Sequence, residues 1–307
     1  MADPTIETIS KPMAWFLATR PKTLVLALGP ILLAGLLALD TDTTSNWLIF
    51  PIIILSAVCI QIATNLWNDA ADATSGLDNA QERLGPPRMT SLGLLQAGHV
   101  RLAAVLFLLL ASIFGLSLVF FGGWPILAIG IVGILCAFGY SSGPYPISSS
   151  PFGELFVISF FGIMSVMGTT YLLIEQWTLV SFWAGLYIGL PAAAVLTVNN
   201  HRDRDGDKLG GRHTLVIEIG PKRTKQVYAI FILVSCIGII HVHNLLEPGT
   251  LSLASLIFSA LLMAYSLMVP IRHFFLASSA AELNACLMRT SIFQLQWVLA
   301  FGAVLLF

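Results

Sequence analysis

Long apolar runs alternate with short polar segments along nearly the whole chain. The runs are about 17 to 22 residues long, close to the length of about 20 at which a helix crosses a hydrocarbon core of about 30 Å. A backbone in that core must satisfy its hydrogen bonds within its own segment, which a helix does. We therefore predict nine membrane-spanning helices, at residues 23–39, 47–66, 102–121, 124–141, 152–174, 177–198, 226–243, 251–270 and 290–307.

The composition supports the same fold class. Of the 307 residues, 57% are hydrophobic and 10% are charged, whereas soluble domains carry about 25% charged residues. This balance excludes an ordinary soluble domain. We expect one polytopic, all-α integral membrane domain over residues 1–307, with the lipid bilayer as a partner and no nucleic-acid partner.

Charge is distributed unequally between the two sides of this nine-helix arrangement. All 15 Lys and Arg residues fall on one side, and the opposite loops carry only Asp40, Asp42, Glu175 and Glu247. A miscounted span would exchange the sides of every later loop and destroy this segregation. Basic loops stay on the cytoplasmic side of membranes. We therefore predict that the N-terminus lies in the cytoplasm, that the protein lies in the cytoplasmic (inner) membrane, and that the C-terminus lies on the opposite side.

A polar stretch ends the second expected helix. Asn65, Asn68, Asp69 and Asp72 stand at helical positions i, i+3, i+4 and i+7, so they project from one face, and Asp78 follows. Carboxylates so close together repel each other unless they are protonated or bridged by a metal. We assign Asn68, Asp69, Asp72 and Asp78 as metal ligands, with Mg²⁺ as the metal and Mn²⁺ as a possible substitute.

A second stretch ends the sixth expected helix, where Asp203 and Asp207 stand at i and i+4. A mixed-charge run is ordinarily a solvated face. This run, however, repeats the chemistry of the first one, on the same side and four spans later. We interpret residues 23–141 and 152–270 as pseudo-repeated four-helix halves, followed by a last helix at 290–307. Two facing motifs could hold two divalent ions and a diphosphate, with Asp203 and Asp207 as ligands.

Several other polar residues lie near these motifs. Cations suit the diphosphate oxygens that a metal does not cover, and the candidates are Arg83, Arg88, Arg202, Lys208 and Arg212. Arg20 and Lys22 are either topological anchors or contacts to an anionic substrate. We assign them to acceptor binding, together with Asn65, Asn199 and Asn200. For Glu154, a cap of the fifth helix is favoured over a catalytic role.

Acidic metal sites opposite cations, inside an apolar bundle, suit a substrate with a diphosphate head and an isoprenyl tail. Bound magnesium stabilises the negative charge that develops on a departing diphosphate. The allylic carbocation left behind can be stabilised by aromatic faces such as Tyr140, Phe160 or Phe161 and attacked by an electron-rich ring. Asp72, Asp203 and Tyr140 are the catalytic candidates, although a tyrosine at this depth is more often an interfacial belt residue.

Two other classes of function are compatible with a polytopic membrane protein that carries acidic clusters. A cation transporter needs polar groups near the bilayer midplane, whereas here the acidic motifs are confined to one face and the middles of the helices are apolar. A structural subunit would leave the clustered Asp residues without a purpose. An enzyme is therefore favoured.

These motifs resemble those of the UbiA superfamily of intramembrane aromatic prenyltransferases. The family's first motif corresponds to Asn68, Asp72 and Asp78, and its second to Asp203 and Asp207. The segments NLWNDAADATSGLD and NNHRDRDGDKLGGRHTLVIEIG are similar to the branch that prenylates 1,4-dihydroxy-2-naphthoate for menaquinone.

This resemblance implies nine helices, Mg²⁺, and transfer of a polyprenyl group from polyprenyl diphosphate to the ring. It also implies loss of CO₂ and diphosphate, which gives demethylmenaquinone. Prenylation of 4-hydroxybenzoate or of a phylloquinone precursor is the alternative.

Overall fold

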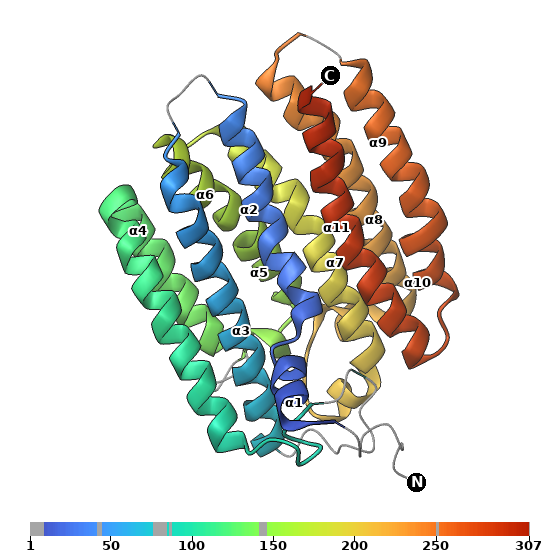
Figure 1. Ribbon diagram of the computed structural model, residues 1–307. Coiled ribbons are helices and arrows are strands. Elements are labelled where there is room, and N and C mark those ends of the chain that lie inside the picture. Colours follow the sequence, from blue (N-terminus) through green and yellow to red (C-terminus); the bar gives the residue numbers. More distant parts are fainter. Residues whose placement is uncertain are drawn as a thin grey trace.

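The computed structural model describes residues 9–41, 45–75, 85, 88–140, 146–249 and 252–306, except for the side chains of residues 72–75 and 138. All regular structure in these ranges is helical, as expected for an all-α protein. The helices form an elongated bundle (Figure 1). Their bounds are α1 (Lys11–Ala18), η1 (Pro21–Thr23), α2 (Leu24–Leu39), η2 (Trp47–Ile49), α3 (Phe50–Ser75), α4 (Ala97–Gly139), η3 (Ile147–Ser149), α5 (Gly153–Val157), η4 (Ile158–Met164), α6 (Ser165–Ile174), α7 (Leu179–Leu209), α8 (Leu215–Leu246), α9 (Leu253–Ser266), η5 (Leu267–Ile271), α10 (Arg272–Leu276) and α11 (Ala280–Leu306).

Within the described residues, eight helices are long and apolar enough to cross a membrane. Together they include the cores of all nine expected spans. Many large apolar side chains point outward, among them Phe120, which is 90% exposed, and Leu135, which is 65% exposed. Such surfaces are unfavourable in water and suit contact with lipid. The chain is therefore a multi-pass membrane protein.

The expected spans 102–121 and 124–141 both lie in α4, whose backbone leaves the helical conformation at Gly123 (φ 62°, ψ −150°). A positive φ of this kind is accessible chiefly to glycine. Leu108 and Ala137 nevertheless line one small crevice against α3, although a straight helix would separate them by roughly 40 Å at 1.5 Å per residue. Helix α4 therefore doubles back at Gly123, and both of its legs pack beside α3.

The direction of the helices brings the two polar stretches to one end of the bundle. Helices α3 and α7 both run downward in Figure 1 and end near α1 and the N-terminus, while α11 ends with the C-terminus at the opposite end. The long connection after α3 and the loop after α7 thus lie at the same end. This arrangement allows the two Asp motifs to contribute to one site.

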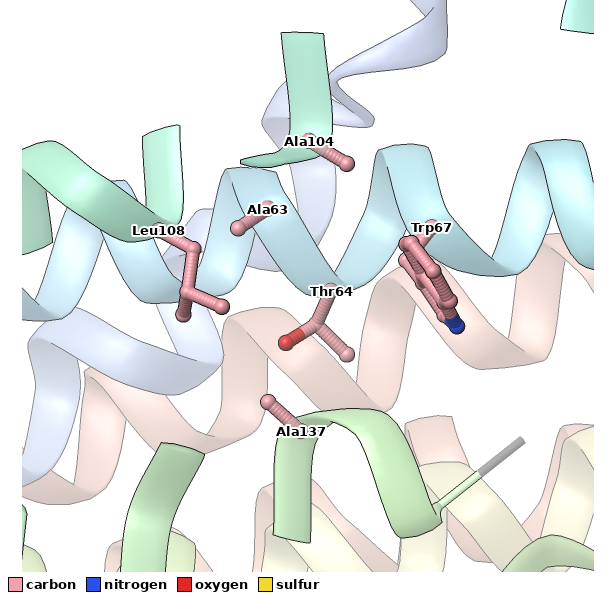
Figure 2. A pocket seen from close by; sticks show the side chains of 6 residues that line it. All are labelled: Ala63, Thr64, Trp67, Ala104, Leu108 and Ala137. Carbon is pink, nitrogen blue, oxygen red and sulfur yellow. The ribbon is translucent and has the colours of Figure 1, made fainter. Parts of the chain in front are cut away.

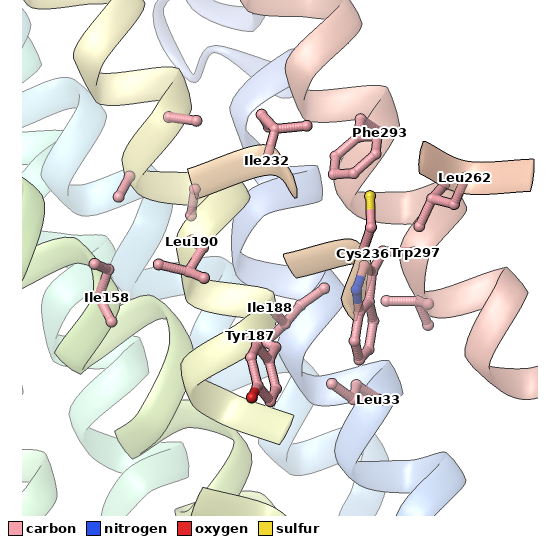
Figure 3. Packing of buried hydrophobic residues seen from close by; sticks show 14 of the residues in the cluster. Leu33, Ile158, Tyr187, Ile188, Leu190, Ile232, Cys236, Leu262, Phe293 and Trp297 are labelled. Atoms are coloured by element: carbon pink, nitrogen blue, oxygen red, sulfur yellow. The ribbon is translucent and has the colours of Figure 1, made fainter. Parts of the chain in front are cut away.

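A large apolar cluster holds α2, η4, α7, α8, α9 and α11 together (Figure 3). Trp297 and Phe293 of α11 are fully buried in it. The Trp297 indole N–H donates a hydrogen bond to the carbonyl oxygen of Ser235 at 2.6 Å, so the polar end of this large ring is satisfied. The cluster gives α7 a rigid support along the length that leads to the second motif.

The crossing of η4 and α7 depends on Gly162, Gly185 and Gly189. A Cβ at Gly162 would lie 2.3 Å from the carbonyl oxygen of Gly185 and 2.7 Å from the Cα of Gly189. Small residues allow helix backbones to approach this closely within membranes. Because the obstructing atoms belong to the backbone, a side chain added here cannot be accommodated by a change of rotamer.

We predict that Gly162→Ala lowers the free energy of unfolding by about 1 to 3 kcal/mol, since it overpacks this crossing. The matched control is Gly130→Ala, because a Cβ at Gly130 would meet no atom within 4 Å. Thermal unfolding of both purified variants in detergent provides the measurement. Equal midpoints for Gly162→Ala and Gly130→Ala would contradict the prediction.

Candidate active site

The first polar stretch lies at the carboxyl end of α3. Asp72 belongs to this helix, but its side chain lies outside the described part of the structure, as do Asp78 and Arg83 entirely. The structure therefore resolves the contacts of the earlier residues of the motif and leaves the metal-ligand assignments of Asp72 and Asp78 as predictions.

Asp69 is 2% exposed and receives its hydrogen bonds from the segment that follows the long connection. Its carboxylate accepts from the backbone N–H groups of Met89 at 3.3 Å and Thr90 at 3.2 Å, and from the Thr90 hydroxyl. These bonds fasten residues 88–90 to the end of α3. The local geometry makes Asp69 an anchor for this segment, and its assignment as a metal ligand stays a prediction.

Arg88 is buried in the same region, and its guanidinium donates to the backbone carbonyl of Asn68 at 2.7 Å. The anchor made by Asp69 thus fixes a cation directly beside the motif. The predicted diphosphate contact Arg88 and the predicted metal ligand Asn68 are brought together, although their sequence numbers differ by 20.

Asn65 connects α3 to the beginning of the chain. Its side-chain N–H₂ donates to the Thr19 carbonyl and to the Thr23 hydroxyl, both at 2.9 Å. Thr19 and Thr23 flank Arg20 and Lys22, so the Asn65 amide holds the backbone of that basic segment against α3. The structure thereby places Arg20 and Lys22, two of the predicted acceptor contacts, at the motif end of the bundle. Asn65 is the residue that positions them.

The second polar stretch is organised by Arg202, whose side chain is 1% exposed. Its guanidinium forms two bonds with the Asp203 carboxylate, of 2.8 and 2.6 Å, and donates to the side-chain oxygens of Asn199 at 2.8 Å and of Asn284 at 2.7 Å. Paired, charge-assisted bonds of this kind fix geometry strongly. Arg202, which the sequence predicts to bind diphosphate, is surrounded by protein acceptors that it orients.

One turn later, the Asp207 carboxylate accepts a 2.8 Å bond from Arg212, in the loop after α7. Their side chains are 12% and 25% exposed, respectively, so both retain some access to the outside of the bundle. Lys208 is exposed beside them. Arg212 and Lys208 therefore supply positive charge at the mouth of the second motif.

The donor chemistry of this motif fits a hard divalent cation. An ionised carboxylate offers about four lone-pair positions, and the Arg202 and Arg212 contacts occupy only some of those on Asp203 and Asp207. Carboxylate and amide oxygens are ligands that Mg²⁺ accepts. Among the side chains that the structure describes, no three His, Cys, Asp or Glu residues are grouped closely enough to hold a metal, so a complete site would draw on the first motif as well.

Glu154 is a residue for which the sequence favoured a helix cap over a catalytic role. It lies in the first turn of α5 but is 2% exposed, and its Oε1 accepts from the Asn200 side chain at 3.1 Å. An acidic residue in the first turn of a helix gave the only sequence signal, and that signal is common at exposed helix starts. Only the packing of α5 against α7 reveals that this carboxyl group is buried.

A row of three aromatic rings lies near this point. Tyr140 lies 5.8 Å from Phe156 between ring centroids, and Phe156 stacks on Phe160 at 4.5 Å. Glu154 and Arg212 lie close enough to Tyr140 to act electrostatically on its phenol. Phe161, the other predicted aromatic, packs against the large apolar cluster. Among the residues that the structure describes, the rings of this row are thus Tyr140, Phe156 and Phe160.

Figure 2 shows a second feature near this end, an apolar crevice between α3 and the two legs of α4. Its volume of about 10 Å³ is at the lower limit for a single water molecule. It is lined by Ala63, Thr64, Trp67, Ala104, Leu108 and Ala137. A crevice of this size cannot hold a prenyl chain, so we assign it no part in the site.

Comparison with known proteins identifies the class of this membrane-embedded bundle. Residues 27–303 match the UbiA prenyltransferase family. The chain belongs to the UbiA prenyltransferase family and is an aromatic prenyltransferase.

Among its relatives are two proteins named 1,4-dihydroxy-2-naphthoate octaprenyltransferase. The protein from Escherichia coli is 32% identical over 251 residues, which is 78% of this chain and 80% of the relative. The protein from Bacillus subtilis is 32% identical over 230 residues, or 72% and 71% of the two chains.

The fold also matches that of a solved structure, a UbiA homologue from Archaeoglobus fulgidus bound to DMAPP and Mg²⁺. The TM-score is 0.64 at 16% identity, with 95% of this chain and 98% of the other covered. At that identity the likeness establishes the fold, and it agrees with the all-helical architecture described above.

We predict that Asp69→Asn destabilises the protein by about 1 to 3 kcal/mol, because an amide N–H₂ would face backbone donors at a buried position. Asp205→Asn serves as the control, since the Asp205 side chain is 84% exposed. Thermal unfolding in detergent measures both. An Asp69→Asn variant as stable as Asp205→Asn would refute the anchoring role.

Proposed function

We propose that the protein transfers a polyprenyl group from polyprenyl diphosphate to 1,4-dihydroxy-2-naphthoate, with loss of CO₂ and diphosphate, to give demethylmenaquinone in its reduced, quinol form. The observation that carries the proposal is the second motif, in which buried Arg202 orients Asn199 and Asp203 at the same end of the bundle as the first motif. The names of the bacterial relatives support the choice of acceptor.

In this proposal, Asn68, Asp72 and Asp78 of the first motif and Asp203 and Asp207 of the second hold Mg²⁺, for which Mn²⁺ could substitute. When bound, the metal supplies positive charge against the diphosphate and favours its departure. Arg202 acts through Asp203 and Asn199 as a positioning residue. It prevents these side chains from adopting other rotamers in a region of low dielectric, where misplaced charge is costly.

The remaining cations are proposed to bind the diphosphate directly. Arg212 and Lys208 lie at the mouth of the second motif, and Arg88 is fixed beside Asn68. Arg83, from the connection after α3, would complete the set. Planar guanidinium groups can bind two phosphate oxygens at once, which makes arginine well suited to this role.

The aromatic row is proposed to face the carbon that loses the diphosphate. The Tyr140, Phe156 and Phe160 rings form a continuous series, with centroid separations of 5.8 and 4.5 Å. Aromatic faces attract cations, most strongly when water is excluded. These rings would lower the energy of the allylic cation and keep water away from it until the acceptor ring attacks.

We propose that the acceptor enters beside η1. Asn65 holds the segment that contains Arg20 and Lys22 against α3, and the positive charge of these residues would attract the acceptor carboxylate. Asn199 and Asn200 approach from the second half of the chain. Prenylation of 4-hydroxybenzoate or of a phylloquinone precursor would need the same cations. These reactions would differ only in the aromatic ring that the site accepts.

The reversal of α4 at Gly123 leads us to propose nine membrane crossings, with the two legs of α4 counted separately. The halves 23–141 and 152–270 would then be repeats that each present an Asp motif from their second helix, followed by the ninth crossing in α11. The Lys and Arg residues would lie on the cytoplasmic side with the N-terminus, and the site would open to the cytoplasm.

Asp203→Asn is expected to lower kcat by about 10² to 10³-fold, the usual cost of removing one group that stabilises charge in the transition state. The thermal midpoint should also fall, because asparagine offers one uncharged acceptor oxygen to buried Arg202, which bonds both oxygens of the Asp203 carboxylate. Turnover is therefore compared for protein that remains folded. Product formation measured by mass spectrometry is the test. Full activity of Asp203→Asn would contradict the proposed mechanism.

Metal removal tests the same mechanism in the wild-type enzyme. Chelation should abolish turnover, and added Mg²⁺ or Mn²⁺ should restore it.

Arg202→Lys is expected to weaken apparent Mg²⁺ affinity by about 10- to 100-fold, as is typical when a group that orients a metal ligand is removed. Lysine keeps the charge but cannot make the paired bonds to Asp203 together with those to Asn199 and Asn284. Arg204→Lys is the control, since Arg204 binds the exposed carboxylate of Asp205. Titration of activity with Mg²⁺ distinguishes them, and identical curves would exclude a positioning role for Arg202.

A further inference from the structure

The Glu154 carboxyl has no function in the proposed binding of metal or diphosphate. It is 2% exposed. Oε1 accepts from Asn200, whereas Oε2 is buried and receives no hydrogen bond from any residue that the structure describes. A buried carboxyl oxygen without a partner costs considerable free energy. That cost would be offset if a bound substrate supplied the missing partner.

The surroundings of Glu154 contain few other groups that could interact with it. From α7, the Asn200 amide contacts Oε1, and Thr197 lies nearby but donates its hydroxyl proton to the Ala193 carbonyl at 3.0 Å. Tyr140, at the end of α4, is the titratable side chain on which Glu154 acts, and Arg212 also acts on that phenol. In the described structure no group forms a hydrogen bond to Oε2.

The location of Glu154 relates it to both parts of the site. Asn200, its partner, lies on α7 between Asn199 and Arg202, within the second motif. Tyr140, on whose phenol Glu154 acts electrostatically, belongs to the aromatic row with Phe156 and Phe160. A ring placed between the diphosphate region and the aromatic row would therefore lie close to this carboxyl group.

We propose that Glu154 is a further catalytic residue, whose Oε2 accepts a hydrogen bond from the acceptor hydroxyl adjacent to the carboxylate-bearing carbon and takes its proton. This inference rests on the proposed function and assigns the proton acceptor of that reaction. Ionising the hydroxyl raises the electron density of the neighbouring ring carbon, which is the atom that must attack the prenyl group.

The proton and electron pairs balance without an added reagent. The hydroxyl proton moves to Glu154 while the ring carbon forms a bond to the prenyl C1, and the C1–O bond breaks with its electron pair on the diphosphate. The bond to the carboxylate carbon then breaks, CO₂ departs, and its electron pair returns the ring to an aromatic phenolate. Glu154 gives the proton back to that oxygen, and the carboxylate is ready for another cycle.

Glu154 could instead only hold Asn200 in place, and the dependence of the rate on pH separates the two roles. Glutamine at this position keeps an oxygen for the Asn200 bond but cannot take a proton. If Glu154 is the proton acceptor, the variant must use acceptor that has already ionised in solution, so its kcat/KM should rise with pH in proportion to the ionised fraction of the hydroxyl. A structural role would lower kcat/KM equally at every pH.

The experiment measures kcat/KM for the acceptor against pH for wild type, Glu154→Gln and the control Glu218→Gln, whose side chain is 50% exposed. We expect Glu154→Gln to lose about 100-fold at neutral pH, a usual contribution of general base catalysis, and to recover at high pH or with an acceptor of more acidic hydroxyl. Glu218→Gln should match wild type. A Glu154→Gln profile that equals wild type, or lies below it by a constant factor, overturns the proposal.

Two arms keep the result interpretable. Glu154→Asp retains a carboxylate, so it should show lower kcat but the wild-type pH profile; it provides the test if Glu154→Gln does not fold. An Asp variant whose rate follows ionisation of the hydroxyl would also overturn the proposal. Inactivity of the wild-type enzyme with every aromatic acceptor would instead be a failure of the proposed function, so the two failures can be told apart.

Discussion

The arrangement of the site depends on one buried guanidinium, that of Arg202. It makes four hydrogen bonds, two to Asp203 and one each to Asn199 and Asn284. An isolated cation at 1% exposure would be strongly unfavourable, and only dense pairing makes such burial acceptable. Because Asn284 lies on α11, the same group joins the second motif to the last helix. Rigidity at the motif therefore follows from the requirement to satisfy a buried charge.

The same requirement explains why the polar chemistry is concentrated at one end of the bundle. The lipid-embedded lengths of the helices are apolar, held by the large core cluster and by the glycine crossing of η4 with α7. Charged side chains gather where α3 and α7 end, and hydrogen bonds hold several of them in place. Arg88 donates to the Asn68 carbonyl, and Asp69 accepts from the backbone N–H groups of Met89 and Thr90. An apolar interior beside a polar mouth matches a substrate that has an isoprenyl tail and a diphosphate head.

Local patterns in the sequence were sufficient to predict an all-helical, multi-pass fold and to locate the two polar stretches, because length, hydropathy and helical spacing act over neighbouring residues. They were insufficient for contacts between distant segments. Arg202, which the sequence predicts to bind diphosphate, bonds to Asn284 on α11, 82 positions away. No local pattern indicates this contact, which fixes the guanidinium that orients Asp203. Asp69 lies on the predicted helix face that also carries Asn68, yet its carboxylate accepts hydrogen bonds from the backbone of Met89 and Thr90. The burial of Glu154 arises from the packing of α5 on α7, which no local pattern encodes.

The central claim is that a carboxylated naphthalene ring is prenylated at the carbon that loses CO₂. The most direct measurement supplies the purified enzyme with polyprenyl diphosphate, Mg²⁺ and 1,4-dihydroxy-2-naphthoate labelled with ¹³C in its carboxyl group, and follows the label by mass spectrometry. The account predicts one labelled CO₂ released for each prenylated product, which itself carries no label. A prenylated product that retains the labelled carboxylate, or no prenylated product at all, would contradict it.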